Sequence, residues 1–263
     1  MSDDLLETIE DGVATVTMNR PEARNAFTAE MMVGLTEAFN RLAADTSVRV
    51  VVLTGAGGAF CAGGDVKSFA ANAGAKINLD ARILDLRTRM EVSRVLHEMP
   101  KPTLAVIPGP AAGAGFSLAM ACDMRIAADT AKITTAFSKV GLSGDFGGSF
   151  FLTKLLGAAK ARELYFTGDV VLGKEAAAIG MVSKSVPDTE LPEAAAAMAK
   201  HLASLPTVAV GYMKKNLNTA LEGSLSDVLD WEATNMVRSF ETEDHQGAAK
   251  AFVEKRAPVF NGR

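Results

Sequence analysis

The stretch at residues 108–123 constrains what this chain can fold into more than any other part of the sequence. Before it, an apolar run at residues 103–107 lies between prolines and predicts a short buried strand. Glycines and alanines then predict a tight loop, and from about Ala114 the pattern becomes helical, with Leu118 and Cys122 on one face. A helix that begins in such a loop points free N–H groups outward and carries a partial positive charge there. We expect these N–H groups to hold an oxygen that becomes negative during a reaction.

A second interpretation of this loop is purely structural, as a sharp connection between a strand and a helix. A third, nicotinamide binding, is weak, because Gly113 and Gly115 are not followed by the third glycine of the G-x-G-x-x-G pattern.

The composition limits the class of protein. With 263 residues, 48% of them hydrophobic, the chain can build one large domain, or a core with a helical appendage. The net charge is −4 and the basic residues are scattered, which argues against nucleic-acid binding. Cys61 and Cys122 make no disulfide framework and have no zinc-ligand spacing, so we expect no metal site. No stretch has the apolar length of a membrane span or a signal core, and we expect a cytoplasmic protein that does not bind membranes.

The order strand, small-residue loop, helix recurs along the chain and predicts an α/β fold with repeated ββα units. Strands are expected at 13–18, 48–54, 103–107, 124–127 and 181–183, and helices after Thr28 and at 77–98, 158–166 and 174–179. From Pro192 onward the pattern is only helical. We therefore predict a core at residues 1–200 and a C-terminal helical region at residues 201–263.

Two small-residue loops, at 55–65 and 108–113, each follow a predicted buried strand. If each supplies one backbone N–H to the same carbonyl oxygen, the pair stabilises an enolate or oxyanion by several kcal/mol. A thioester suits such a site, because its α-protons become acidic once its oxygen is held.

This chemistry also needs a proton carrier, and Asp145 is the best candidate by its position in a glycine-rich loop at 137–148. Poor solvation near Phe146 and Phe150 would raise the pKa of this carboxyl toward a useful range. The alternative is that Asp145 is only a turn residue. A Ser-His-Asp mechanism is unsupported, because Ser117 has no histidine motif near it in the sequence.

The same residues carry a resemblance to a known family. Residues 60–65 and 108–123 resemble the two signature loops of the crotonase, or enoyl-CoA hydratase/isomerase, superfamily, and residues 19–27 and 252–256 are similar to its terminal patterns. The resemblance covers nearly the whole chain. It implies a spiral of ββα repeats, a C-terminal helical region that makes a homotrimer or a dimer of trimers, and an acyl-CoA substrate. Coenzyme A then enters as part of the substrate, with no separate cofactor.

By position, the resemblance implies that the N–H groups of Ala62 and Ala114 hold the thioester oxygen. Lys255 matches a position that reaches the CoA of a neighbouring subunit. The residues expected to bind the acyl-CoA are Arg24, Ala26, Ala62, Gly63, Gly64, Asp65, Val66, Ala114, Ser117, Phe137, Phe146 and Lys255.

Departures from the family pattern bear on the reaction. Hydratases of the family carry two glutamates, at the positions where this chain has Ser117 and Phe137, and neither residue can act as acid or base in adding water. Asp145 remains, in a segment similar to that of family isomerases, including those of phenylacetate degradation. We therefore expect an enoyl-CoA isomerase with Asp145 as the proton shuttle. The alternatives are a hydratase-type lyase with a water held by Ser117, and a non-catalytic protein that binds CoA esters; hydrolysis or dehalogenation by the aspartate also stays open.

Overall fold

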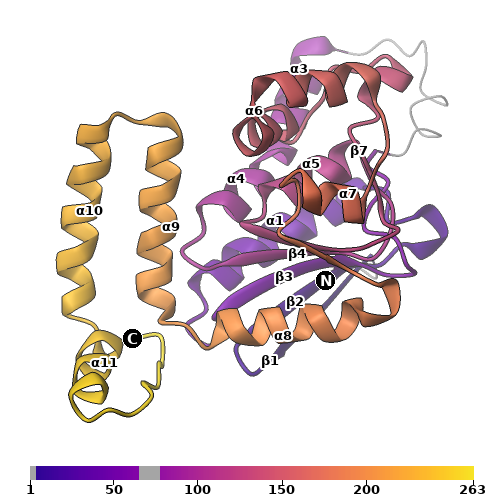
Figure 1. Cartoon of the computed structure of the whole chain (residues 1–263). Coiled ribbons are helices and arrows are strands. Elements are labelled where there is room, and N and C mark those ends of the chain that lie inside the picture. Colours follow the sequence, from indigo (N-terminus) through magenta and orange to yellow (C-terminus); the bar gives the residue numbers. More distant parts are fainter. Residues whose placement is uncertain (1–3, 65–77) are drawn as a thin grey trace.

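The chain is described by a computed structural model that covers residues 4–64 and 78–263 (Figure 1). A six-stranded sheet runs through the core, and β1 pairs antiparallel with β2 while the later neighbours are parallel. In spatial order its strands are β1 (Leu5–Glu10), β2 (Val13–Met18), β3 (Val50–Gly55), β4 (Thr103–Ile107), β6 (Met124–Ala128) and β9 (Lys184–Val186). The strongly apolar β3 is buried along nearly its whole length, as expected for a central parallel strand.

A smaller three-stranded sheet joins β5 (Ala111–Ala112), β7 (Lys132–Thr134) and β8 (Val171–Leu172). Because β5 comes directly before α5 (Ala114–Ala121), this sheet helps to fix where that helix begins. The expected strand at 103–107 and the expected helix start at Ala114 are both confirmed.

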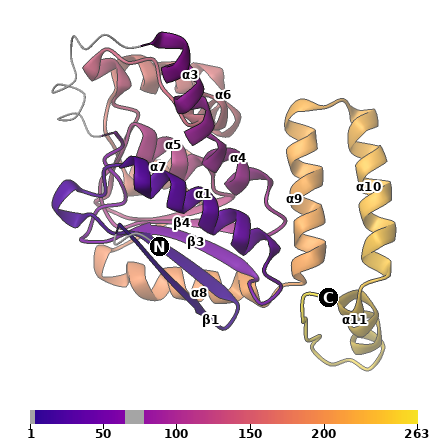
Figure 2. The ribbon, with the colours of Figure 1, turned by 180° about the vertical axis from the view of Figure 1, so that it is seen from behind.

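Helices cover both faces of the larger sheet (Figures 1 and 2). On one face lie α1 (Ala29–Ala44), α4 (Glu91–Glu98) and α5, and α8 (Leu191–Ala203) lies along the other face and contacts β2, β3 and β6. The Thr28 hydroxyl accepts a hydrogen bond from the Met31 N–H at 3.0 Å, which confirms it as the cap of α1. The remaining core elements are α3 (Leu79–Arg89), α6 (Gly148–Thr167), α7 (Gly173–Ala178), and the 3₁₀ turns η1 (Pro21–Ala23), η2 (Phe137–Val140) and η3 (Asp188–Glu190).

Several expected boundaries were wrong. The single helix expected at 77–98 is two helices that meet at Met90, because α4 buries Val92, Val95 and Leu96 in the core whereas α3 buries no residue. Packing therefore sets the direction of α4 and not of α3. The loop expected at 137–148 contains η2, and the strand expected at 181–183 forms three residues later, as β9.

The C-terminal region consists of α9 (Thr207–Glu222), α10 (Leu225–Phe240) and α11 (Glu243–Val253). Figures 1 and 2 show α9 beside the core, α10 on the far side of α9, and α11 below both. Ser224 and Asp227 form a capping box at the start of α10. No helix in the described ranges is long and apolar enough to cross a membrane. The division at residue 200 stays a prediction.

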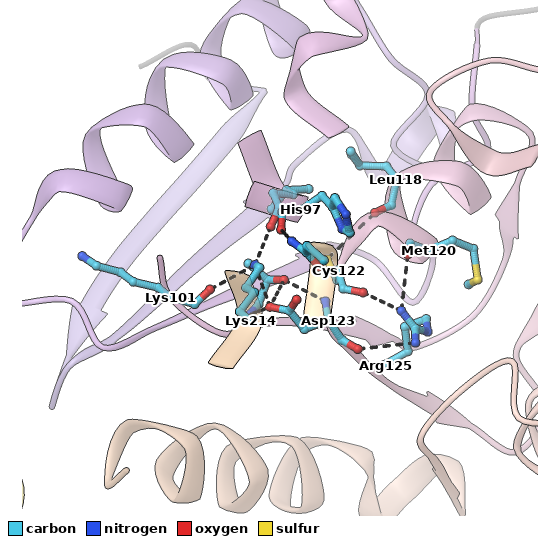
Figure 3. Close-up of polar contacts among 11 residues, drawn as sticks. His97, Lys101, Leu118, Met120, Cys122, Asp123, Arg125 and Lys214 are labelled. Carbon is cyan, nitrogen blue, oxygen red and sulfur yellow. Dashed lines mark hydrogen bonds and ion pairs between the residues drawn. The ribbon is translucent and has the colours of Figure 1, made fainter. Parts of the chain in front are cut away.

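A buried lysine joins α9 to the core (Figure 3). Lys214, whose side chain is 7% exposed, donates hydrogen bonds to the carbonyls of Leu96 and Lys101 at 2.8 and 3.2 Å. It also pairs with Asp123 at 2.8 Å, and Asp123 in turn accepts hydrogen bonds from the N–H and hydroxyl of Thr103. The end of α4, the start of β4 and the segment after α5 thus meet at one ammonium group.

Candidate active site

The two small-residue loops lie side by side at the start of α5. The N–H groups of Phe60 and Cys61 both donate to the carbonyl of Pro110, at 3.0 and 3.1 Å, and the Ala112 N–H donates back to the Cys61 carbonyl at 2.9 Å. These bonds join loops that are far apart in the sequence, as the hypothesis of a shared site requires.

The N-terminal segment that contains Arg24 and Phe27 lies on the other side of the first loop. The Phe27 N–H donates to the carbonyl of Gly63 at 2.8 Å, and the Ala62 N–H donates to the carbonyl of Arg24 at 2.9 Å. The expectation that the Ala62 N–H is free to hold a thioester oxygen is therefore wrong, because an internal carbonyl already accepts its hydrogen.

Asn25 fixes this arrangement. Arg24 and Asn25 both have positive φ, 49° and 58°, a conformation that asparagine tolerates better than most residues. The fully buried Asn25 side chain accepts a hydrogen bond from the Arg20 N–H at 2.9 Å. Its amide nitrogen donates to three carbonyls of the neighbouring loop, those of Ala56, Ala59 and Phe60. One side chain thus holds the first loop and turns the Arg24 carbonyl toward it.

The Cys61 side chain also holds the first loop in place. Its thiol donates to the Asn25 carbonyl at 3.0 Å and accepts from the Gly63 N–H at 3.3 Å. Burial raises the pKa of this thiol to about 12, so it stays protonated and acts as a structural group.

One other amide can take the place expected for Ala62 as an oxyanion donor. Within the described ranges, the N–H groups of Gly64 and Ala114 donate no hydrogen bond to the protein. Gly63 has a φ of 86°, and a Cβ built on it would lie 3.1 Å from the Ala114 nitrogen and 2.7 Å from the Ala112 carbonyl oxygen. Only glycine allows this close approach, which brings Gly64 beside the first turn of α5. Ala114 therefore stays a candidate donor, and Gly64 replaces Ala62 as its partner.

Asp145 lies in a conformationally strained turn. Gly144, Phe146 and Gly147 have φ values of 105°, 50° and 77°, and Phe146 adopts its value without the freedom of glycine. The Asp145 side chain is half-buried, and its Oδ1 has no hydrogen-bond partner. Burial raises the pKa of this carboxyl to about 6. Such a carboxylate can both take and return a proton near neutral pH.

Aromatic rings connect this turn to the loops. Phe146 lies 5.6 Å from Phe27, measured between ring centroids, and Phe27 forms a β-bridge with Gly64. Phe137 stacks on Tyr165 at 5.9 Å with an interplanar angle of 19°. The site therefore has an apolar wall that limits the solvation of Asp145.

Sequence reasoning missed Tyr165, which lies in α6, twenty positions after Asp145 in the chain. Its hydroxyl is buried, makes no hydrogen bond of normal geometry and has the Ser117 hydroxyl as a polar neighbour. Burial raises the pKa of this phenol, the interaction with the Ser117 hydroxyl lowers it, and the charge of Asp145 raises it further. A Cβ built on Gly148 would lie 2.2 Å from Ser117 Oγ and 2.5 Å from the Tyr165 hydroxyl. Gly148 thus lets these two hydroxyls come together. A tyrosine in a helix gives no sequence signal that separates this role from core packing.

The structure does not bring all of the other expected binding residues to the two loops. Ala26 is buried, and its carbonyl accepts a hydrogen bond from the Arg20 guanidinium at 2.7 Å. Lys255 is exposed and follows α11, which Figures 1 and 2 show far from α5, so a single chain does not bring it to the site. Asp65 and Val66 lie outside the described residues. The roles of these residues stay predictions.

Comparison with known proteins shows the family of the chain. The family model described as Enoyl-CoA hydratase/isomerase matches residues 8–263. The chain belongs to the enoyl-CoA hydratase/isomerase family. The resemblance to the crotonase superfamily and the expected α/β fold with a C-terminal helical region are thereby confirmed.

Several family members are similar over the whole chain. A 1,2-epoxyphenylacetyl-CoA isomerase of Escherichia coli is 35% identical, with 100% of both chains covered. A probable enoyl-CoA hydratase of Rhodobacter capsulatus is 37% identical, with 97% of this chain and 96% of the relative covered. Among solved structures, a putative enoyl-CoA hydratase from Streptomyces coelicolor has a TM-score of 0.93 at 36% identity, with 99% of this chain and 94% of that chain covered. These relatives include both an isomerase and a probable hydratase, so the residues of the site must decide between the two reactions.

Proposed function

We propose that this enzyme is an enoyl-CoA isomerase that uses Asp145 as its single proton shuttle. The observation that carries the proposal is the half-buried Asp145 carboxyl, which has one unpartnered oxygen and a pKa raised to about 6. Ser117 and Phe137, at the positions of the hydratase glutamates, supply no second acid or base.

In the proposed mechanism, the N–H groups of Gly64 and Ala114 hold the thioester oxygen of the acyl-CoA. Both amides are fixed before the substrate binds, by the hydrogen bonds between the loops and by the start of α5. Preorganised donors of this kind stabilise the developing negative charge by several kcal/mol, because no reorganisation is needed during the reaction. The start of a helix adds a favourable partial positive charge.

Asp145 then moves one proton between two carbons. With a 3-enoyl thioester, the carboxylate removes a proton from C2, and the released electron pair moves onto the thioester oxygen, which gives a dienolate held by the two amides. The protonated Asp145 then delivers a proton, which can have exchanged with solvent, to C4: the C3–C4 π electrons form the new C–H bond, and the enolate electrons re-form the carbonyl and the C2–C3 double bond. Nothing is added or lost, so a single group near its own pKa is sufficient. Hydration would instead need a base and an acid on either side of one water.

Product analysis tests this reaction type. Incubated with 3-hexenoyl-CoA, the enzyme is expected to produce 2-hexenoyl-CoA without accumulating 3-hydroxyhexanoyl-CoA, as measured by liquid chromatography with mass detection. Rapid formation of the 3-hydroxy product from crotonyl-CoA would instead support the hydratase alternative, which the relatives named as hydratases favour. Tight binding without any turnover over a broad acyl-CoA panel would support the non-catalytic alternative.

The pH dependence of the reaction follows from the state of Asp145. The carboxylate form is the active base, and burial places the pKa of this group at about 6. We therefore expect kcat/KM to be constant above pH 7 and to fall about tenfold per pH unit well below pH 6. Initial rates measured between pH 4.5 and 8 check this. A flat profile across pH 5 to 7, or one that falls as pH rises, contradicts the assignment.

We also propose that the C-terminal helices mediate assembly into a homotrimer or a dimer of trimers. Large apolar side chains on α9, α10 and α11 are exposed in the single chain, among them Met213, Leu217, Leu229, Met236, Val237 and Phe252. Burial against a second copy removes this apolar surface from water. Coenzyme A is proposed to enter only as part of the substrate, and a cytoplasmic location stays a prediction.

A further inference from the structure

Three polar groups converge beside the proposed proton shuttle. Ser117 Oγ and the Tyr165 hydroxyl lie within 2.5 Å of the same point, the Cβ position that Gly148 lacks. The turn that carries Asp145 lies against the same ring, because a Cβ built on Gly144 would lie 3.0 Å from Tyr165 Cε1. The three side chains come from α5, α6 and the turn before α6, so the tertiary fold brings them together.

These polar groups are poorly satisfied within the protein. Asp145 Oδ1 is buried and has no hydrogen-bond partner, and the buried Tyr165 hydroxyl makes no hydrogen bond of normal geometry, with the Ser117 hydroxyl as its polar neighbour. The Ser117 hydroxyl donates only to the Gly113 carbonyl, at 3.3 Å, which is long for a hydroxyl donor. Buried polar groups are nearly always paired in folded proteins, so a cluster of unpaired ones indicates a missing partner. Two neutral hydroxyls can donate to an oxygen atom that carries lone pairs.

The location of the two hydroxyls relative to the thioester site indicates which carbon of the acyl group would carry the oxygen atom that they bind. Ser117 lies three residues after Ala114 in α5, about one helical turn of roughly 5.4 Å from the proposed thioester site. A hydroxyl at that spacing faces the C2 or C3 atom of an acyl group whose carbonyl oxygen is held by Gly64 and Ala114. A hydrocarbon acyl group would offer the Tyr165 hydroxyl no acceptor and would leave the Ser117 hydroxyl with only its long hydrogen bond to Gly113.

We propose that Ser117 and Tyr165 form a polar subsite that binds an oxygen substituent at C2 or C3 of the acyl group. The preferred substrates are then oxygenated acyl-CoA thioesters, and simple enoyl-CoA thioesters are bound less tightly. The inference rests on the proposed function in one respect: the thioester oxygen of the substrate is placed at the N–H groups of Gly64 and Ala114. Tyr165 and Ser117 act here as specificity-determining residues, and the proton still moves through Asp145.

The test compares two ligands of matched length, butyryl-CoA and 3-hydroxybutyryl-CoA, by isothermal titration calorimetry. The wild-type enzyme is expected to bind the hydroxy thioester about tenfold more tightly, the value of one or two net hydrogen bonds. Tyr165→Phe keeps the ring that stacks on Phe137 and removes only the hydroxyl. This variant is expected to bind the two ligands with nearly equal affinity, while its affinity for butyryl-CoA stays unchanged.

Ser117→Ala is a second, independent variant that should lower the same preference. Tyr212→Phe, which changes the other tyrosine of the chain on α9, is the matched control and should keep the wild-type preference. Equal binding of both ligands by the wild type, or equal weakening of both in Tyr165→Phe, overturns the proposal. Chromatography of the titrated samples keeps the two proposals separate. Conversion of 3-hydroxybutyryl-CoA to crotonyl-CoA would reject the isomerase assignment, whereas the polar subsite is judged by the ratio of affinities alone.

Discussion

Replacement of Asp145 by asparagine is expected to slow proton exchange at the acyl carbons by about 10²–10⁴-fold. The amide keeps the shape of the carboxylate but cannot accept a proton near neutral pH. CoA-thioester binding is expected to change less than twofold, because the proposed oxygen donors, Gly64 and Ala114, are main-chain groups. Nuclear magnetic resonance in D₂O measures the rate at which deuterium enters C2 and C4 of 3-hexenoyl-CoA.

Ser143→Ala is the matched control, because Ser143 is an exposed side chain in the same loop. It should exchange deuterium at the wild-type rate. Loss of folding is not expected in Asp145→Asn. The pKa of Asp145 is higher in the folded protein than in the unfolded chain, so its charged form weakens the fold as pH rises through about 6, and an uncharged amide avoids this cost. Wild-type deuterium incorporation by a folded Asp145→Asn enzyme would rule out the proposed shuttle.

The second large effect is expected from Lys214→Met, which removes the ammonium group between α9 and the core. Methionine has a similar length and is apolar, but it leaves the carbonyls of Leu96 and Lys101 without their donor and Asp123 without its counter-ion. Breaking a largely buried ion pair on one side costs about 3 kcal/mol, near the lower end of the measured range, since the Asp123 side chain is 26% exposed. Urea unfolding followed by circular dichroism measures the free energy of unfolding.

Lys200→Met provides the control, since Lys200 is an exposed lysine near the end of α8. Its free energy of unfolding should stay within about 0.5 kcal/mol of wild type. The double variant Lys214→Met with Asp123→Asn should lose less than the sum of the two single changes, because neither charge is then left alone. Equal stability of Lys214→Met and Lys200→Met would show that the buried pair contributes nothing.

Local patterns in the sequence predicted the parts of the fold that depend on neighbouring residues. The apolar run before Pro108 predicted β4, and the change to helical spacing at Ala114 predicted the first residue of α5. Thr28 predicted the start of α1, because a helix cap needs only a side chain and an N–H three residues later. Asp145 was also found this way, since its glycine-rich surroundings and neighbouring phenylalanines are adjacent in the chain.

Features that depend on contacts between distant residues could not be predicted in the same way. The Ala62 amide was chosen by position in the first loop, but the carbonyl that occupies it belongs to Arg24. That carbonyl is turned toward Ala62 by the positive φ values of two non-glycine residues and by the side chain of Asn25, none of which a loop motif reveals. The partners of Tyr165 are Phe137 and Ser117, which reach it only through the packing of α6 on α5 and η2.

The sulfur atom inside the first loop has a practical consequence. Oxidants and alkylating reagents attack the thiolate form of cysteine, and the Cys61 thiol is fully covered and remains protonated at every pH at which the enzyme would be handled. The turn that presents Gly64 is therefore held by a side chain that reagents in solution do not reach. Redox conditions can vary without altering the geometry on which turnover depends.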